Sequence, residues 1–142
     1  MRDYAALNIV WGGAVAGLLR ATDKPAPPLR ELPVIGLAAF SVSKALSKEK
    51  IGAWVRQPVV DEPQAGDPEP AGRGLRHALG ELVTCSRCLG TWSSLGLVGF
   101  RVVAPREAQI VTTILASAAL NDFLQSGFTT LCRTANMLAD DD

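Results

Sequence analysis

Four apolar stretches, set apart by polar breaks, constrain the fold of this 142-residue chain more than any other feature of its sequence. They cover residues 4–19, 32–46, 88–104 and 108–132, and the last three are interrupted by Lys44, Arg101 and Asp122. None sustains the alternation of a β-strand, and their length and their Ala and Leu content favour helices. The sequence therefore predicts an all-α protein with a single helical domain over residues 1–142.

The length of these stretches is near that of a membrane span. A spanning helix needs about 20 apolar residues, within a range of about 17–25. The first, third and fourth stretches approach that length, whereas residues 32–43 cover only about half a bilayer. We expect a small membrane-embedded bundle of three to four helices. A soluble four-helix bundle is the alternative, but the third stretch has little of the polar face that such a bundle requires.

Polar breaks divide the chain into parts. Residues 23–28 are rich in Pro and separate the first two stretches, and residues 105–107 form a tight corner between the last two. Residues 61–72 are acidic and rich in Pro and Gly. The predicted organisation is an N-terminal helix pair over 1–47, a flexible acidic loop over 60–74, and a C-terminal helical hairpin over 78–135 that carries a Cys-x-x-Cys motif.

The basic residues predict the orientation of such a bundle, because cytoplasmic loops carry an excess of Lys and Arg. With the middle loop and both termini in the cytoplasm, nine basic residues lie inside and five outside. The inside set is Arg2, Lys44, Lys48, Lys50, Arg56, Arg73, Arg76, Arg87 and Arg133, and the outside set is Arg20, Lys24, Arg30, Arg101 and Arg106. We therefore expect a multi-pass protein of the cytoplasmic (inner) membrane.

The charge balance also bears on partners. Lys and Arg together number 14, as do Asp and Glu, so the formal net charge is zero. A nucleic-acid-binding protein usually has a basic face, and this chain has no basic excess. The expected partners are the lipid bilayer and either another membrane protein or a second copy of the chain, with no nucleic acid.

Cys85 and Cys88 form the sharpest local motif. Three residues apart on a helix, they share one face. A helix N-terminus and the neighbouring Arg87 would lower a thiol pKa, which suits redox chemistry. The pair could also be half of a zinc site, but a complete site needs about four ligands, and the other candidates are His77, Cys132 and carboxylates. No cofactor is assigned, and the alternative is that the small cysteines only allow close helix packing.

Three further residues belong to this region. Asp122 interrupts the last apolar stretch, and a carboxylate inside an apolar helix usually faces the bundle interior. Counted from the turn near Pro105, Cys88 lies roughly 26 Å back along a helix and Asp122 roughly 24 Å forward. This predicts Asp122 beside Arg87 or the cysteine pair, with Cys132 too far away. The alternative is that Asp122 meets headgroup water near the cytoplasmic end of its helix.

Glu81 and Trp92 flank the cysteine pair as supporting residues. A Glu before the third apolar stretch favours the helix macrodipole, which is a structural interpretation of Glu81. Trp92 follows the motif in the apolar stretch itself.

More than half of the chain resembles a known family. The matching segments are Lys50-Ile51, Val55-Arg56-Gln57-Pro58, Gly80-Glu81-Leu82-Val83-Thr84-Cys85, Cys88-Leu89-Gly90, Trp92 and Ala119-Leu120-Asn121-Asp122-Phe123-Leu124. They resemble the bacterial membrane-protein family catalogued as domain of unknown function 1360. The resemblance implies a small integral membrane protein, with relatives described as sporulation proteins or found in phages, and it implies no chemistry. Val59 replaces the Phe usual in that family, and the first apolar stretch lies outside the match.

The functional expectation follows from these observations. We expect a protein of structural, accessory or interaction type rather than an enzyme, since no nucleophile elbow, zinc-protease motif or phosphate loop is present in the sequence. The alternative is a thiol-redox or metal-binding membrane protein that uses Cys85 and Cys88. A holin-like pore former is a weaker alternative, because no repeated polar stripe could line a channel.

Overall fold

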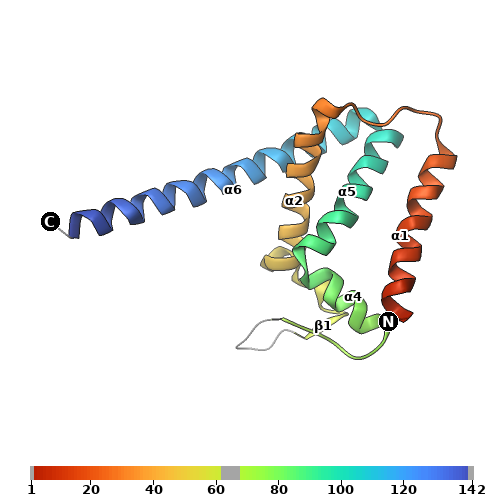
Figure 1. Ribbon diagram of the computed structural model, residues 1–142, viewed down its shortest axis with the longest axis horizontal. Coiled ribbons are helices and arrows are strands. Elements are labelled where there is room, and N and C mark those ends of the chain that lie inside the picture. The colour runs from red at the N-terminus through yellow and green to blue at the C-terminus, as the bar shows by residue number, and fades with distance from the viewer. Residues whose placement is uncertain (1, 62–67, 141–142) are drawn as a thin grey trace.

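The computed structural model describes residues 2–61 and 68–140, and these residues are mainly helical (Figure 1). The α-helices are α1 Arg2–Ala21, α2 Leu32–Lys48, α3 Ala53–Arg56, α4 Leu75–Thr84, α5 Ser86–Val103 and α6 Pro105–Asp140. Two 3₁₀ turns, η1 Leu29–Glu31 and η2 Lys50–Gly52, precede α2 and α3. The all-α prediction is confirmed, with six α-helices in the described ranges where three to four were expected.

Proline marks the starts of the helices that build the bundle. Pro33 lies in the first turn of α2, and Pro105 is the first residue of α6. Proline suits these positions because its fixed φ matches the helix and the first backbone N–H groups have no helical partner anyway. Ala104 breaks the helix between α5 and α6 with φ −128° and ψ 75°. The corner expected at 105–107 therefore lies one residue earlier.

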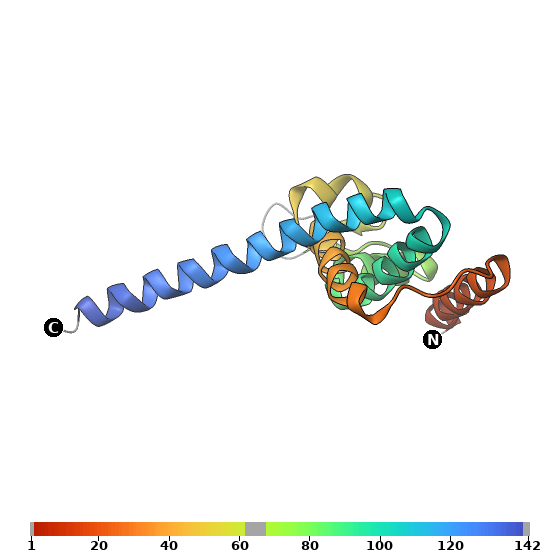
Figure 2. The ribbon, with the colours of Figure 1, turned by 90° about the horizontal axis from the view of Figure 1, so that it is seen from above.

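The packed centre of the molecule is α2, which lies against both α5 and α6 (Figures 1 and 2). Ile35, Ala38 and Ala39 of α2 are buried together with Leu97 of α5. Small side chains allow helix backbones to approach closely. The Ser41 hydroxyl uses this approach to donate a 2.8 Å hydrogen bond to the Leu115 carbonyl of α6.

The first helix packs differently. α1 lies along α4 and α5, and Figure 1 places α5 between it and α2. The predicted N-terminal pair over 1–47 is thus two helices consecutive in sequence whose principal neighbours come from the C-terminal half of the chain.

A short polar segment connects α2 to α4. The Arg56 side chain is 4% exposed and donates to the carbonyls of Leu46 and Glu49, at 2.7 and 3.0 Å, which fixes the C-terminal end of α2. β1 Val60–Asp61 pairs antiparallel with β2 Glu69–Pro70. Part of the loop predicted to be flexible over 60–74, residues 62–67, lies outside the described residues.

Gly80 of α4 is required by a close approach. A Cβ at this position would lie 2.4 Å from the Val59 carbonyl oxygen and 2.9 Å from Pro70. Only glycine lets α4 rest on the segment that carries the two short strands. Gly80 is also the first residue of the Gly-Glu-Leu segment, so this part of the motif has a packing reason.

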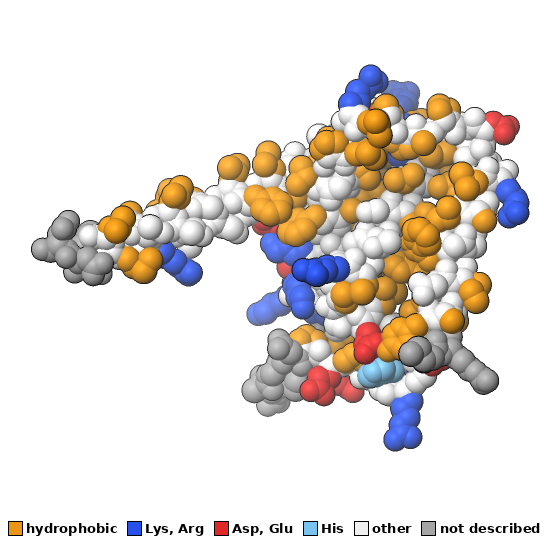
Figure 3. Space-filling view, in the orientation of Figure 1, with side chains coloured by type: hydrophobic (Ala, Val, Ile, Leu, Met, Phe, Trp, Pro, Cys, Tyr) orange, Lys and Arg blue, Asp and Glu red, His pale blue; other side chains and the backbone are white. Residues whose placement is uncertain are grey.

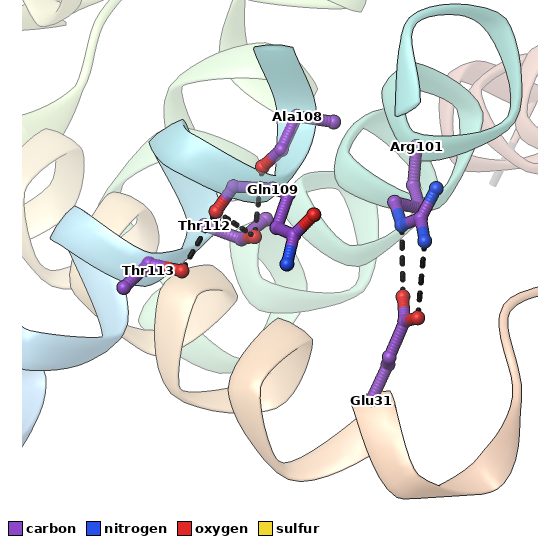
Figure 4. Close-up of polar contacts among 6 residues, drawn as sticks. All are labelled: Glu31, Arg101, Ala108, Gln109, Thr112 and Thr113. Atoms are coloured by element: carbon purple, nitrogen blue, oxygen red, sulfur yellow. Dashed lines mark hydrogen bonds and ion pairs between the residues drawn. The ribbon is translucent and has the colours of Figure 1, made fainter. Parts of the chain in front are cut away.

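α6 consists of two parts with different surroundings. Its first part buries Ala108, Thr112, Ala116 and Ala119 against the bundle. The Phe123 ring stacks on Phe40 of α2, and from Leu124 to Leu138 every side chain is exposed as the helix extends away from the other elements (Figures 1 and 2). Figure 4 shows the first part, where the Thr112 hydroxyl donates to the Ala108 carbonyl at 2.7 Å.

One described helix has the length and composition of a membrane span. It is Asp3–Ala21 within α1, with a mean hydropathy of 1.2 and none of its apolar window buried against the rest of the protein. Within residues 2–61 and 68–140 no other helix has both properties.

Candidate functional site: a cavity beside the cysteine pair

A cavity of about 730 Å³ lies between α1 and the α4–α5 segment. Its wall on the α1 side consists of Tyr4, Leu7, Asn8 and Trp11. The opposite wall consists of Ala78, Glu81, Leu82, Thr84, Cys85, Cys88, Thr91 and Trp92. The structure thus gathers four residues singled out from the sequence, Glu81, Cys85, Cys88 and Trp92, around one space.

Cys85 forms the joint between α4 and α5. Its backbone N–H donates to the Glu81 carbonyl at 3.1 Å, which closes the last turn of α4, while its own carbonyl accepts from Leu89 at 2.9 Å in the first turn of α5. Its sulfur accepts a 3.3 Å hydrogen bond from the Cys88 backbone N–H. Cys85 is therefore the N-cap of an 18-residue helix.

This position changes the acidity of the thiol. A hydrogen bond from the Cys88 side chain, followed by hydrogen bonds from the Cys88 and Arg87 backbone and the charge of Arg87, lowers the pKa of Cys85 below its ordinary value of 9.0, against an opposing effect of burial. A thiolate at a helix N-terminus is the more nucleophilic form of cysteine. Cys85 is therefore the chemically activated member of the pair.

A group of polar side-chain contacts lies at the edge of the cavity near the cysteine pair. The Tyr4 hydroxyl of α1 donates to the Glu81 carboxylate of α4, and His77 lies 3.5 Å from the same carboxylate. These contacts connect α1 to the rest of the fold. Deeper in the wall, the Trp11 indole nitrogen is buried and has no hydrogen-bond partner among the described residues.

Asp122 lies elsewhere. Its carboxylate accepts a 2.7 Å hydrogen bond from Lys44 of α2, and Lys44 also lies 3.4 Å from Glu49. Within the described ranges no hydrogen bond or ion pair joins Asp122 to either cysteine or to Arg87. Sequence reasoning predicted Asp122 beside Arg87 or the cysteine pair, and it did not identify Lys44 as the partner that the structure gives it.

The remaining candidates are distributed as follows. Arg87 is exposed at the start of α5 and acts on Cys85 through its backbone N–H and its charge. Cys132 is exposed on α6, in the stretch where every described side chain is exposed. Among the described residues no group of three or more His, Cys, Asp and Glu is arranged to hold a metal ion. Cys85 and Cys88 are free thiols in the structure.

Sequence reasoning missed the α1 wall of the cavity. Tyr4, Asn8 and Trp11 are spaced by four and three residues, so they share one face of a helix. This polar and aromatic face in an otherwise apolar segment is the signal that could have found the wall.

Comparisons with known proteins agree with the motif. Residues 34–128 match the family described as "Protein of unknown function (DUF1360)". The chain is also 28% identical over 101 residues to the Bacillus subtilis (strain 168) "Sporulation protein YjcA", a match that covers 66% of this chain and 86% of that protein. No solved structure matches.

Proposed function

The chain belongs to the family described as "Protein of unknown function (DUF1360)", and we propose that it is a small integral membrane protein that acts by interaction rather than by catalysis. The match begins in α2 and ends within α6, so it includes the cysteine pair and leaves out α1 and the end of α6. The description of its relative as a sporulation protein supports a bacterial setting for this role.

The observation that carries this proposal is the apolar surface left uncovered. On α1, Ile9, Val10 and Leu19 are 74%, 58% and 73% exposed. On α6 exposed apolar side chains recur from Ile110 to Leu138, and Figure 3 has hydrophobic side chains along the projecting part. Soluble monomers rarely expose contiguous apolar patches of more than a few hundred Å². Such a surface is expected to contact lipid, a protein partner or both.

The arrangement of the helices supports one orientation. The N-terminus of α1, the C-terminal end of α2 and the N-terminal end of α5 meet at one end of the bundle (Figure 1). The basic residues of the middle segment, such as Lys48, Lys50 and Arg73, belong to that end. With that end in the cytoplasm, the distribution of Lys and Arg agrees with the positive-inside tendency.

Extraction of membranes tests the proposal. The protein should stay in the membrane fraction after a carbonate wash, and Val10→Glu with Ala14→Glu should release it, since both positions are exposed on α1 and their change disturbs no packing. Thr22→Glu, just past the helix, is the matched control and should stay bound. Release of the unmodified chain by carbonate contradicts the proposal.

The activated thiol favours a second candidate function, a membrane thiol-disulfide protein. Its specific observation is the position of Cys85 at the N-cap of α5, hydrogen-bonded by Cys88, on the wall of a cavity that could admit a substrate. In this function Cys85 attacks as a thiolate and Cys88 completes an intrachain disulfide, and the two hydrogens pass to the oxidised partner.

Thiol chemistry tests this second candidate. In Cys132→Ser protein, diamide should oxidise the pair to a disulfide within one chain, with a loss of two hydrogens by mass as the diazene becomes a hydrazine. Because its pKa is lowered, Cys85 should reach half of its maximal alkylation rate below pH 9.0, and Arg87→Gln should move that pH upward. Failure of the disulfide to form, or a Cys85 whose alkylation rate reaches half of its maximum at or above pH 9.0, leaves the pair with a packing role.

A further inference from the structure

One face of α6 carries a regular apolar repeat along almost the whole helix. Steps of four and three residues, repeated from Ile110, pass through Ile114, Leu124, Phe128 and Leu131 and end at Leu138. The repeat covers 29 residues, or about 42 Å of helix. Spacing of this kind, with an average of 3.5 residues, is the pattern of a helix that pairs with another helix in a left-handed coiled coil.

The fold leaves this face uncovered. Ile110, Ile114, Leu124, Phe128 and Leu131 are between 62% and 71% exposed. The residues that α6 does bury, such as Ala108, Thr112 and Ala119, lie on the opposite side of the helix. α6 therefore uses one face to hold the bundle together, and its second apolar face, here called the α6 seam, has no cover within the described chain.

We propose that the α6 seam binds the α6 seam of a second copy of this chain, as a parallel two-stranded coiled coil. This inference rests on the proposed function of an interaction protein and names its partner.

The polar residues of the seam favour a second helix over lipid as the cover. The repeat passes through Ser117 and Asn121 near its middle, and both side chains are exposed. Asn121 facing hydrocarbon would leave its amide without partners. In a parallel pair Asn121 instead lies opposite its own copy at an a position, where a buried Asn is known to fix register and to favour two strands. Leu124, Leu131 and Leu138 then occupy d positions, which suit leucine.

The charges of α6 permit this pairing. The positions that flank the seam between residues 111 and 134 carry no Asp, Glu, Lys or Arg. Arg133 lies at the outermost position of the repeat, and Asp122 is held by Lys44 on the bundle side. Two identical seams can therefore meet without like charges facing each other.

The projecting end of α6 needs a cover more than the first part does. From residue 124 onward α6 has exposed side chains only, as far as Leu138. A helix of about this length is marginal in water without tertiary packing. A partner along the seam supplies that packing over the full length of the projection.

Disulfide crosslinking of the full chain in mild detergent tests the proposal. Cys85, Cys88 and Cys132 are first replaced by Ser, which preserves an N-cap at position 85. A single cysteine is then introduced by Leu131→Cys on the seam or by Ser126→Cys at an outermost position. Under copper-phenanthroline oxidation, Leu131→Cys should form a covalent dimer at least tenfold faster than Ser126→Cys. Position 131 lies away from the centre of the repeat, so an antiparallel pair would keep the two sulfurs apart.

The mass of the protein–detergent complex, measured by light scattering, supplies the second readout. The complex of the unmodified chain should contain two copies, and Leu124→Glu with Leu131→Glu should reduce it to one while the bundle remains folded, since both residues are exposed. Arg133→Glu is the matched control and should remain a dimer. A monomer at all concentrations, or equal crosslinking at positions 126 and 131, overturns the proposal and leaves lipid as the cover. A dimer without crosslinking at position 131 overturns the parallel register. A monomer that still resists carbonate extraction rejects this inference alone and leaves the proposed membrane location standing.

Discussion

α1 and α2 are apolar helices of similar length, yet the fold treats them in opposite ways. α2 buries Ile35, Ala38, Ala39, Ser43 and Ser47 between two neighbouring helices, whereas no residue of α1 with a described side chain is fully buried. Both helices carry many small residues, but Ala38, Ala39, Ser43 and Ser47 of α2 are buried, whereas Gly12, Gly13, Ala14 and Gly17 of α1 are exposed. Apolar character and small residues therefore indicate that a helix can be covered closely, but they do not indicate whether the chain supplies that cover itself.

The largest expected difference between α1 and α2 is the loss in free energy of unfolding when one isoleucine of each helix is replaced by alanine. Ile35→Ala should lower the free energy of unfolding by about 3 kcal/mol, because it leaves a cavity at a 5% exposed position in the core. Ile9→Ala, at a 74% exposed position of α1, should cost less than about 0.5 kcal/mol. Denaturant unfolding of the purified protein in detergent measures both. Equal losses would mean that α1 is packed as tightly as α2.

The next largest loss of stability is expected at the C-terminal end of α2. Arg56→Met should cost about 2 kcal/mol, because buried hydrogen bonds to the carbonyls of Leu46 and Glu49 are lost. Arg76→Met is the control, since exposed Arg76 donates to the Pro58 carbonyl from the surface and its loss should cost less than about 1 kcal/mol. The same unfolding measurement ranks the two, and the reverse order would contradict the view that α2 is anchored through Arg56.

A smaller effect is expected at the other end of α2, where Arg101 of α5 holds Glu31 with two hydrogen bonds of 2.8 and 3.0 Å (Figure 4). The hydrogen bond from Arg101 and its charge lower the pKa of Glu31 below its ordinary value of 4.5. A carboxyl with a lowered folded-state pKa stabilises the fold above pH 4.5 and loses that contribution as the pH falls through the folded-state value. The Tm should therefore decrease more steeply below pH 4.5 in the native chain than in Glu31→Gln, and parallel profiles would exclude this contact as a contributor.

The smallest effect is expected where α1 meets α4. Tyr4→Phe removes the hydrogen bond to Glu81, which is exposed, so the unfolding midpoint should not change measurably. Amide hydrogen exchange in α1 should nevertheless become faster, since few other contacts hold the helix. A clear drop in the midpoint would show that α1 stabilises the core.

The sequence was sufficient for the fold class and for the position of most helices. Proline at positions 33 and 105 and the apolar stretches between the polar breaks determine where helices begin, and these are local properties. The sequence could not show that α2 packs on α5 and α6, because which helices become neighbours depends on how their faces fit together in three dimensions. The same limit applies to Asp122, whose depth was derived from helix rise but whose partner Lys44 lies 78 residues away.

The candidate site was also predictable from the sequence only in part. Cys85 and Cys88 were found from their spacing, and the N-cap position of Cys85 agrees with the helix start that the motif suggested. The cavity could not be foreseen, since four of its twelve lining residues come from α1, about 80 residues earlier, and their position depends on how α1 lies against α4.

The central place of α2 also has a consequence in time. The Ser41 hydroxyl bonds to a carbonyl that is synthesised 74 residues later. At about 5–20 residues per second, a ribosome takes roughly 4–15 seconds to cover that interval. Until α5 and then α6 are made, the small-residue face of α2 lacks its permanent neighbours, and we expect a chaperone or the insertion machinery to cover it. Among the helices of this protein, α2 is therefore the one whose early environment matters most for the yield of correctly assembled molecules.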